Sequence, residues 1–357
     1  MTLLKLDVFS LRNIHSASIQ PAAGINFIIG ANASGKSSLL EAIFILGRAR
    51  SFRTHHIKQA IGFDQTPLIV SAQLRHHTGD ISNLGIQIDN KQSEIRIDQE
   101  NRQKADLAYA LPVQLIHPKS YLLLDAGPQH RREFLDWGIF NHNRNFLPNW
   151  RRYGKALQQR NALLKTRQTN QLAAWDRELA EYGYWINRFR NEYIDLLQPA
   201  FLQLAGHFLD TSLVELRYSA GWDERQTLDQ CLKADIEKDL RYGFTHSGPH
   251  RADFLTFHNN KLVRDYLSRG QQKLLVLALL LSQVDLLNQG GQNNCCILID
   301  DLTAELDAAN RAKLLKYLAS LGCQVFMTST DLTDFGDLNS VGNYKVFHVE
   351  QGHISPI

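Results

Sequence analysis

Apolar and polar residues alternate along much of the N-terminal part of the chain. The alternation is clearest at Leu3–Leu11, Pro67–Leu74, Ile81–Asp89 and Glu94–Asp98, while Gly24–Gly30 is an almost unbroken apolar run. Alternation with a period of two is typical of half-buried strands, and a short apolar run bounded by glycines is typical of a buried strand. The pattern therefore predicts a β-rich N-terminal region.

One helix interrupts these strands. From Lys36 to Gly47 the apolar residues recur at helical spacing, beginning at Leu39 and continuing to Phe44. Gly47 is expected to end the helix, because glycine readily adopts the left-handed conformation that follows a helical segment.

The middle of the chain changes to a helical period. Amphipathic stretches occupy Arg131–Asn141, Leu147–Lys165 and Leu172–Leu204. We expect a helical insert here, and we expect Pro148 and Pro199 to interrupt it, since proline removes a backbone donor from a helix. These interruptions and the length of the insert argue against a long coiled coil.

After the helical region the strand pattern returns and then alternates with helices. The expected elements are strands at Ala252–His258 and Lys261–Tyr266, a helix at 270–288, a buried strand at 295–300, a helix at 307–320 and a strand at 323–329.

A phosphate-binding motif joins the first apolar run to the first helix. The segment GANASGKS, from Gly30 to Ser37, fits G-x-x-x-x-G-K-[ST], and its position between a strand and a helix is the one such a loop requires. Backbone N–H groups of this loop surround phosphates, Lys36 is expected to reach the β- and γ-phosphates, and Ser37 is expected to bind Mg²⁺. The predicted nucleotide-binding residues are Gly30, Ala31, Asn32, Ala33, Ser34, Gly35, Lys36, Ser37 and Ser38.

Two consecutive acids follow the apolar segment that begins at Cys295. Buried parallel strands deliver such carboxylates at their carboxyl ends, where nucleotides bind. We expect Asp300 to hold the hydration shell of Mg²⁺ together with Ser37, and Asp301, which faces the other way, to orient or activate the attacking water. Lys36, Asp300 and Asp301 are the predicted catalytic residues, with ATP and Mg²⁺ as cofactors.

Positive charge is concentrated in one stretch. The chain has a net charge of only +3, yet Asn141–Arg167 carries a local charge of +7 with no Asp or Glu. Such a block can neutralise nucleic-acid phosphates, although a solvated helix face with its acids elsewhere in the fold is the alternative. Extended upstream, the predicted DNA-contacting residues are Arg131, Arg132, Arg144, Arg151, Arg152, Lys155, Arg160, Lys165 and Arg167.

Two further segments resemble motifs of ABC-type ATPases. Leu267–Lys273 resembles the signature motif, and Ala304–Asp307 resembles the D-loop. The resemblance implies that nucleotide is held between two copies of the chain in a homodimer. The implied residues are Ser268, Gly270 and Gln271, facing the γ-phosphate of the partner copy, and Glu305 and Asp307 in the D-loop.

Six motifs, in this order along essentially the whole chain, resemble the RecF family of DNA-repair proteins. The resemblance implies an ATP-dependent DNA-binding member of the SMC/ABC superfamily with weak, DNA-stimulated ATPase activity. It also implies action with RecO and RecR in placing RecA at single-strand gaps, in the SOS response and in replication-fork maintenance. The segments are Gly30–Ile43, Ser51–Thr54, Gly127–Asp136, Gln159–Lys165, Gly248–Arg251 and Ser268–Lys273.

Three residues depart from the family pattern. Ala33 stands where the loop usually has glycine, Ala252 where an acid sometimes follows Gly-Pro-His-Arg, and Ala304 where the D-loop usually has serine. Ala33 is compatible with the loop if its φ is negative, since alanine is disfavoured only in the left-handed region.

The expected fold is therefore α/β: an ABC-type P-loop ATPase head, with a mixed sheet and flanking helices, into which an α-helical lobe is inserted. The head is expected to comprise residues 1–119 and 243–357, and the lobe residues 120–242. Because the longest apolar run, Leu274–Leu281, is far shorter than the roughly 20 residues of a membrane span, we expect a cytoplasmic protein without a membrane partner.

Three other functions share some of these features. The ATP-binding subunit of an ABC transporter shares the nucleotide motifs, but Gln324–Asp331 has Thr and Ser where such subunits usually carry a switch histidine. An architectural SMC-like protein would need a longer insert, and a scaffold with a vestigial site would not turn over ATP. A metal site at His246 and His250 is not expected, because Gly248 and Pro249 between them break a helix.

Overall fold

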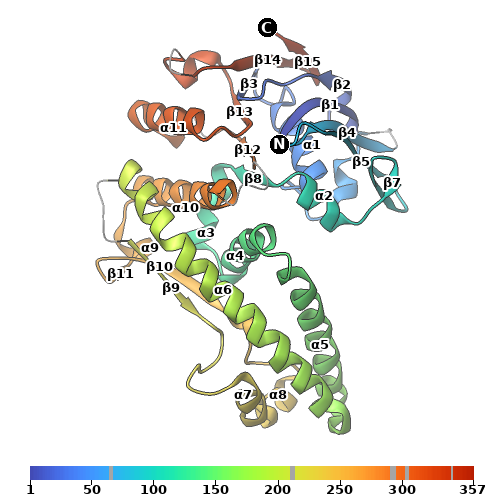
Figure 1. Cartoon of the computed structure of the whole chain (residues 1–357), viewed down its shortest axis with the longest axis vertical. Helices are drawn as coiled ribbons and strands as arrows, with labels where there is room; N and C mark the ends of the chain where they lie inside the picture. The colour runs from blue at the N-terminus through green and yellow to red at the C-terminus, as the bar shows by residue number, and fades with distance from the viewer. Residues whose placement is uncertain (64–66, 210–213, 290–294, 302–304, 339–340) are drawn as a thin grey trace. The chain divides into compact units, whose positions relative to one another are not determined.

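The computed structural model describes residues 1–63, 67–209, 214–289, 295–301, 305–338 and 341–357 (Figure 1). The chain divides into two compact units. Residues 1–120 and 287–357 form the first unit, and residues 121–286 form the second.

The first unit contains an antiparallel sheet built from the N-terminal alternating segments. Its strands lie in the order β2-β1-β4-β5-β6-β7. Every second residue of β4 and β5 is buried, as the alternation predicted. The strands are β1 (Thr2–Leu11), β2 (Ile14–Ile19), β4 (Leu68–Arg75), β5 (Ile81–Ile88), β6 (Ser93–Ile97) and β7 (Glu100–Asn101).

A second, largely parallel sheet completes the first unit. Its order is β15-β14-β3-β13-β12-β8, in which only β15 runs antiparallel to its neighbour. The carboxyl ends of β3, β12 and β13 therefore meet at one edge. The strands are β3 (Ile25–Ile29), β8 (Val113–Ile116), β12 (Cys296–Ile299), β13 (Val325–Ser329), β14 (Tyr344–Glu350) and β15 (His353–Pro356).

Three helices accompany these sheets: α1 (Lys36–Arg48), α2 (Lys104–Ala110) and α11 (Ala308–Ser320). Helix α1 contacts β1, β4 and β5 of the antiparallel sheet and β8 and β13 of the parallel sheet. Its side chains are buried on all sides, since every residue from Ser38 to Gly47 is buried. Enclosure by two sheets explains why this helix has no polar face.

The second unit is mainly helical. Helices α5 and α6 pack against each other (Figure 1). The unit also contains a three-stranded sheet with the order β11-β10-β9. The elements are α3 (Leu122–Asp125), α4 (Pro128–His142), α5 (Phe146–Thr166), α6 (Leu172–Phe208), β9 (Val214–Ser219), α7 (Leu228–Ala234), α8 (Ile236–Tyr242), β10 (Asp253–His258), β11 (Lys261–Leu262), α9 (Val263–Tyr266) and α10 (Arg269–Gln289), which continues into the first unit.

Several expectations for this region were wrong. Helix α6 continues through Pro199, because one lost backbone hydrogen bond does not outweigh the buried face of a 37-residue helix. Pro148 lies in the first turn of α5, where proline is tolerated. Strand β9 lies inside the region expected to be helical and pairs with β10, and Lys261–Tyr266 is a short strand followed by α9 rather than one strand.

The compact units divide at residues 286 and 287, so residues 243–286 pack with the helices of the second unit. The sequence pattern assigned residues 243–286 to the ATPase head. That these residues belong to the head in function stays a prediction. No helix in the described ranges is long and apolar enough to cross a membrane.

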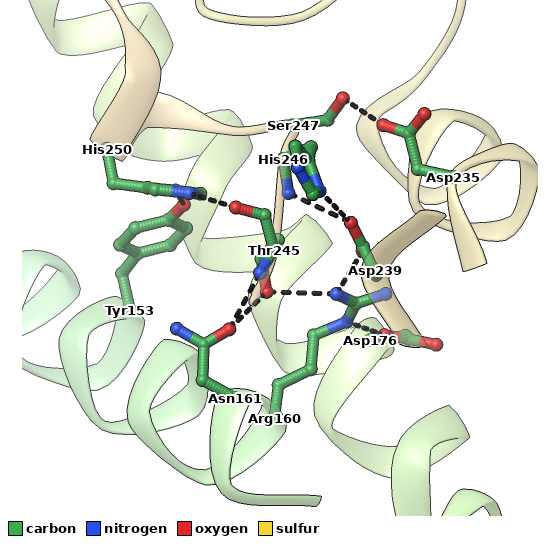
Figure 2. A network of polar contacts seen from close by, with 10 residues as sticks. All are labelled: Tyr153, Arg160, Asn161, Asp176, Asp235, Asp239, Thr245, His246, Ser247 and His250. Carbon is green, nitrogen blue, oxygen red and sulfur yellow. Dashed lines mark hydrogen bonds and ion pairs between the residues drawn. The ribbon is translucent and has the colours of Figure 1, made fainter. Parts of the chain in front are cut away.

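A network of buried polar groups holds α5, α6 and α8 together in the second unit (Figure 2). Arg160 is 0% exposed. Its guanidinium donates to Asp176 Oδ1 at 2.5 Å, to Asp239 Oδ2 at 2.5 Å and to Thr245 Oγ1 at 2.9 Å. Removing one partner of a buried ion pair commonly costs about 3–5 kcal/mol, so this arginine is a structural anchor.

The loop after α8 is fixed by the same network. Asn161 Oδ1 accepts from the backbone N–H of Thr245 at 2.8 Å. Asp239 Oδ1 accepts from the backbone N–H and from Nδ1 of His246, at 3.1 and 2.7 Å. Ser247 Oγ donates to Asp235 Oδ2 at 2.5 Å (Figure 2). Every residue from Thr245 to Ser247 is thereby hydrogen-bonded to α5, to α8 or to the N-cap of α8.

His250 completes this arrangement as a neutral ring. Its Nε2 lies 3.0 Å from the carbonyl oxygen of Thr245, which can only accept, so Nε2 carries the proton. Its Nδ1 then accepts from the hydroxyl of Tyr153 at 2.7 Å. Burial lowers the pKa of His250 from 6.5 to about 4, which agrees with this tautomer.

The lowered pKa predicts a loss of stability in mild acid. Because the unfolded chain takes up a proton at His250 below pH 6.5 while the folded chain does so only near pH 4, the free energy of unfolding falls as the pH drops through that window. A shift of this size corresponds to about 3 kcal/mol. His250→Gln, whose amide can donate and accept, should weaken the pH dependence. Chemical denaturation at pH 7, 6 and 5 measures it, and equal slopes for the two proteins would refute the assignment.

Candidate nucleotide-binding site and basic helix

The predicted phosphate-binding loop joins β3 to α1 in the first unit. Two glycines of the loop, Gly30 and Gly35, occupy positions where a side chain would clash or be strained. A Cβ on Gly30 would lie 2.2 Å from the carbonyl oxygen of Val349, and Gly35 has a φ of 120° beside the amide of Asn13. The close approach of strand β14 and the turn into α1 therefore require glycine at both ends of the loop.

Lys36 lies folded against its own loop. Its Nζ donates to the carbonyl oxygens of Gly30 and Ala31, at 2.8 and 2.9 Å, and the residue is only 4% exposed. An ammonium group has three donors, so one remains for a phosphate oxygen. The hydroxyl oxygen of Ser34 is buried without a hydrogen-bond partner among the described residues, which leaves the loop with an unsatisfied polar group of the kind that a phosphate can satisfy.

The parallel sheet brings Asp300 to this loop. Ser37 Oγ donates to Asp300 Oδ1 at 2.9 Å, and Thr328 Oγ1 donates to the same oxygen at 2.8 Å. The Thr328 hydroxyl also accepts from the backbone N–H of Asp301 at 2.9 Å. One buried hydroxyl on β13 thus orients both predicted acids. Sequence analysis did not single out Thr328, although its place at the carboxyl end of a strand beside β12 was the available signal.

Asp301 differs from Asp300 in its environment. It is exposed, whereas Asp300 is 8% exposed. Burial of part of its surface raises the pKa of Asp301, the charge of Asp300 raises it further, and Lys36 opposes both. A carboxylate with a raised pKa is a better proton acceptor, which suits the role predicted for Asp301.

The donor set at this edge fits Mg²⁺ bound with nucleotide. Mg²⁺ prefers oxygen ligands, and in nucleotide sites it takes one or two from the protein and the rest from phosphates and water. Ser37 Oγ and Asp300 Oδ1 are two such protein oxygens, and they lie 2.9 Å from each other. Within the described ranges, no group of three or more His, Cys, Asp or Glu residues could hold a metal by protein ligands alone.

A buried carboxylate lies on α1 one turn beyond the loop. Glu41 is 0% exposed and accepts from both Nε and Nη2 of Arg12, at 3.0 and 2.9 Å. Ser51 Oγ also donates to it at 2.5 Å, and Arg53 Nη1 lies 3.6 Å away. These contacts connect β1 and the segment from Ser51 to Thr54 to α1. The sequence motif contained Ser51 and Arg53, but only the structure shows that both contact the carboxylate of Glu41.

Asn13 supports the loop from the other side. Its Nδ2 donates to the carbonyl oxygen of Ser34 at 2.9 Å, and its Oδ1 accepts from Ser38 Oγ at 3.1 Å. The backbone N–H of Gly352 donates to the same carbonyl of Ser34 at 2.7 Å. The loop conformation is therefore held by the turn between β1 and β2 and the turn between β14 and β15, as well as by its own glycines.

Ala33 does not have the negative φ that would suit an alanine in this loop. Its φ is 63°, so alanine occupies the left-handed region where glycine is favoured. This backbone conformation explains why the family usually has glycine at this position.

The signature and D-loop residues serve as helix caps. In the second unit, the Ser268 N–H donates to Gln271 Oε1 at 3.0 Å and Ser268 Oγ accepts from the Gln271 N–H at 3.3 Å, a reciprocal cap at the start of α10. Ser268, Gly270 and Gln271 are all exposed. In the first unit, Asp307 Oδ1 accepts from the Asn310 N–H at 2.8 Å at the start of α11. Ala304 lies outside the described residues.

The nine candidate DNA contacts do not form one surface. Arg131 and Arg160 are buried, at 4% and 0% exposure, and are corrected here. Arg131 donates to both carboxylate oxygens of Asp253. Arg132 is half-buried and donates to the carbonyl oxygen of Ala252 at 2.8 Å. The remaining candidates are exposed: Arg144, Arg151, Arg152, Lys155, Lys165 and Arg167.

Comparison with known proteins decides the family. The model of the RecF/RecN/SMC N-terminal domain matches residues 2–355. The chain belongs to this family. A relative from Shewanella denitrificans, named DNA replication and repair protein RecF, is 39% identical over 360 residues and covers 100% of both chains. One of the same name from Pseudomonas fluorescens is 41% identical over 360 residues, covering 99% of this chain and 98% of its own.

Solved structures agree with this family. One described as the recombination mediator protein RecF with ATP in the RecFOR pathway has a TM-score of 0.90 and 27% identity, covering 100% of this chain and 97% of its own. An Smc head domain from Pyrococcus furiosus has a TM-score of 0.59 at 14% identity and covers 100% of this chain and 96% of its own, which supports the ABC-type ATPase fold alone. The predicted fold class is confirmed, and the transporter alternative is not favoured.

The backbone at Ala33 yields a prediction for this RecF/RecN/SMC family member. Ala33→Gly should raise the free energy of unfolding of the nucleotide-free protein by about 1 kcal/mol, because it removes the Cβ from a left-handed position. Thermal or denaturant unfolding measures the gain. Ala31→Gly is the matched control, since Ala31 is a neighbouring exposed alanine without a positive φ and should lose stability through chain entropy. A gain in both variants, or in neither, would contradict this interpretation.

Proposed function

We propose that this chain is an ATP-controlled DNA-binding protein of recombinational repair that acts in the cytoplasm. ATP binding joins two copies around DNA, and slow, DNA-stimulated hydrolysis separates them. The nucleotide thus sets how long the protein stays on DNA rather than driving movement. The observation that carries this proposal is the hydrogen-bonded set of Ser37, Asp300 and Thr328 beside the phosphate-binding loop, in a chain related to RecF proteins over its full length.

Nucleotide binding is supported by how the loop is built. Its backbone surrounds the start of α1, Lys36 lies inside it, and Ser37 faces Asp300. We infer that ATP is bound by Gly30–Ser38 and that Ser37 and Asp300 hold Mg²⁺ with the β- and γ-phosphates. Magnesium would supply positive charge against the phosphates. Asp301, whose pKa is raised by partial burial and by Asp300, would accept the proton of the attacking water.

Dimerisation is supported by the start of α10. Ser268, Gly270 and Gln271 are exposed at the N-terminus of a 21-residue helix, where backbone N–H groups and partial positive charge favour a phosphate. We infer that this end of α10 meets the γ-phosphate held by a second copy. Glu305 and Asp307 would then lie in the D-loop between the two nucleotides.

DNA binding is supported by the exposed cations of α5 and its flanks. Arg151 and Lys155 are exposed one turn apart on one side of the helix. Contacts from such side chains go to phosphates and carry no sequence preference, which suits a protein that acts at gaps of any sequence. The solved structure described as RecF in the RecFOR pathway supports RecO and RecR as partners. We infer RecA as an indirect partner from the resemblance to the RecF family.

ATP turnover tests the nucleotide site. Lys36→Arg and Asp300→Asn should each reduce turnover about 100-fold or more, the usual effect of removing one group that stabilises charge in the transition state. Steady-state phosphate release with and without DNA measures the effect. The matched controls are Lys313→Arg and Asp195→Asn, two exposed residues that are not part of the loop. Wild-type turnover in either site variant would show that these residues are assigned wrongly.

The salt dependence of DNA affinity tests the basic helix. Each phosphate contact contributes about 0.9 to the slope of log K against log salt for duplex DNA. Arg151→Gln combined with Lys155→Gln should therefore lower the slope by about 1.8 in the presence of ATP. The control pair, Arg188→Gln with Lys233→Gln, removes two exposed cations from α6 and α7. An equal slope change in both pairs would mean that α5 has no special role.

A further inference from the structure

Three aromatic rings gather at the end of α8 in the second unit. Tyr242 is 58% exposed and Phe244 is 39% exposed. Their ring centroids lie 6.1 Å apart, and the ring of His246 lies 4.3 Å from Phe244 and 5.4 Å from Tyr242. We call these three residues the aromatic ledge. The exposed rings of Tyr242 and Phe244 offer flat apolar faces to a partner, while the side chain of His246 is only 10% exposed and packs against them.

The ledge is held on a rigid support. Gly243 ends α8 in the left-handed conformation with a φ of 74°. Thr245 is hydrogen-bonded to Asn161 and to the buried Arg160, and His246 is bonded twice to Asp239 (Figure 2). The backbone on both sides of Phe244 is therefore fixed before any partner arrives, which reduces the entropy lost on binding.

Cations lie beside the ledge. Lys165 packs against the turn, since a Cβ on Gly243 would lie 3.2 Å from its Cγ. Arg167 follows it at the end of α5, and Arg241 precedes Tyr242 in the last turn of α8; all three cations are exposed. The segments 159–175 and 240–252 contain no Asp or Glu.

Of the acids of α8 and its N-cap, Asp235 and Asp239 are engaged with other side chains, whereas Glu237 is exposed in the first turn of the helix. Asp239 is 0% exposed and contacts Arg160 and His246, and Asp235 accepts from Ser247. The charges of Asp235 and Asp239 are therefore compensated by these contacts, one of which fixes the ring of His246. What the ledge presents to a partner is aromatic faces together with positive charge.

We propose that the aromatic ledge binds unstacked bases of single-stranded DNA, with Lys165, Arg167 and Arg241 holding the adjoining phosphates. Aromatic side chains flanked by cations form the usual platform for single strands, and this platform tolerates any sequence because every base has a π-face. A duplex keeps its base faces covered by stacking, so the ledge distinguishes a single strand from a duplex. The inference rests on the proposed function and adds a site for the single-stranded part of a gap.

The test compares three DNA probes in the presence of ATP, by fluorescence anisotropy with the full chain. They are an oligo(dT), an oligomer of the same length with abasic sites, and a duplex. Tyr242→Ala combined with Phe244→Ala should weaken oligo(dT) binding about tenfold or more, since stacking on each aromatic side chain contributes about fivefold or more per base. Affinity for the abasic oligomer and for the duplex should not change.

Two further variants separate stacking from folding. Tyr184→Ala is the matched control, because Tyr184 on α6 is also 58% exposed, and it should leave all three affinities unchanged. Phe244→Trp keeps a stacking face and should retain oligo(dT) binding. Circular dichroism and thermal unfolding establish that each variant is folded.

The outcomes are distinguishable. If the wild type binds DNA with ATP and the double variant binds oligo(dT) with the same affinity, the ledge does not bind bases. This outcome overturns the inference and leaves the proposed function unaffected. An equal loss on all three probes overturns base stacking. Unchanged DNA affinities with loss of a protein partner would make the ledge a protein-docking surface and also overturn the inference. A wild-type protein that binds no DNA with ATP overturns both proposals.

Discussion

The enclosure of α1 between two sheets is the constraint on which the first unit depends. Leu39, Leu40 and Ile43 are 0% exposed, and the helix contacts strands of both sheets. A helix buried on all sides cannot shift without opening the core, because protein interiors are packed like crystals. The N-terminus of α1 is therefore fixed, and with it Lys36 and Ser37. The phosphate-binding loop is precise because its helix is immobile.

The second unit depends on buried charge instead. Arg160 contacts Asp176 and Asp239, while Arg190 donates to both oxygens of Asp136 at 2.9 and 3.0 Å. Burial raises the pKa of Asp136, and the positive charge of Arg190 opposes this shift. Such pairs contribute little net stability compared with apolar packing, but breaking one would leave a buried charge unpaired. They fix which loop packs on which helix, and so they hold the turn from Gly243 to His250.

The sequence predicted the nucleotide site well because its determinants are local. A strand, a glycine turn and a helix follow one another within a few residues, and a second strand ends in Asp300 and Asp301, so the pairing of parallel strands was enough to bring these residues together. Thr328 was missed because one threonine at a strand end has no motif. The negative φ that would suit Ala33 is not found in the structure, where φ is 63°, because φ cannot be read from residue type alone.

The errors in the second unit have another physical origin. A proline in a sequence pattern indicates a lost hydrogen bond, whereas α6 is held by its packing against α4, α5, α7 and β9, so it continues through Pro199. Strand β9 exists because β10, distant in sequence, pairs with it. Non-local partners of this kind leave no trace in a local window. The charge count fails in the same way: Asn141–Arg167 has no acids of its own, yet Asp176 and Asp239 neutralise one of its arginines from other helices. A local sum of charge thus locates a basic helix, while only packing decides which of its cations face solvent and can meet a phosphate.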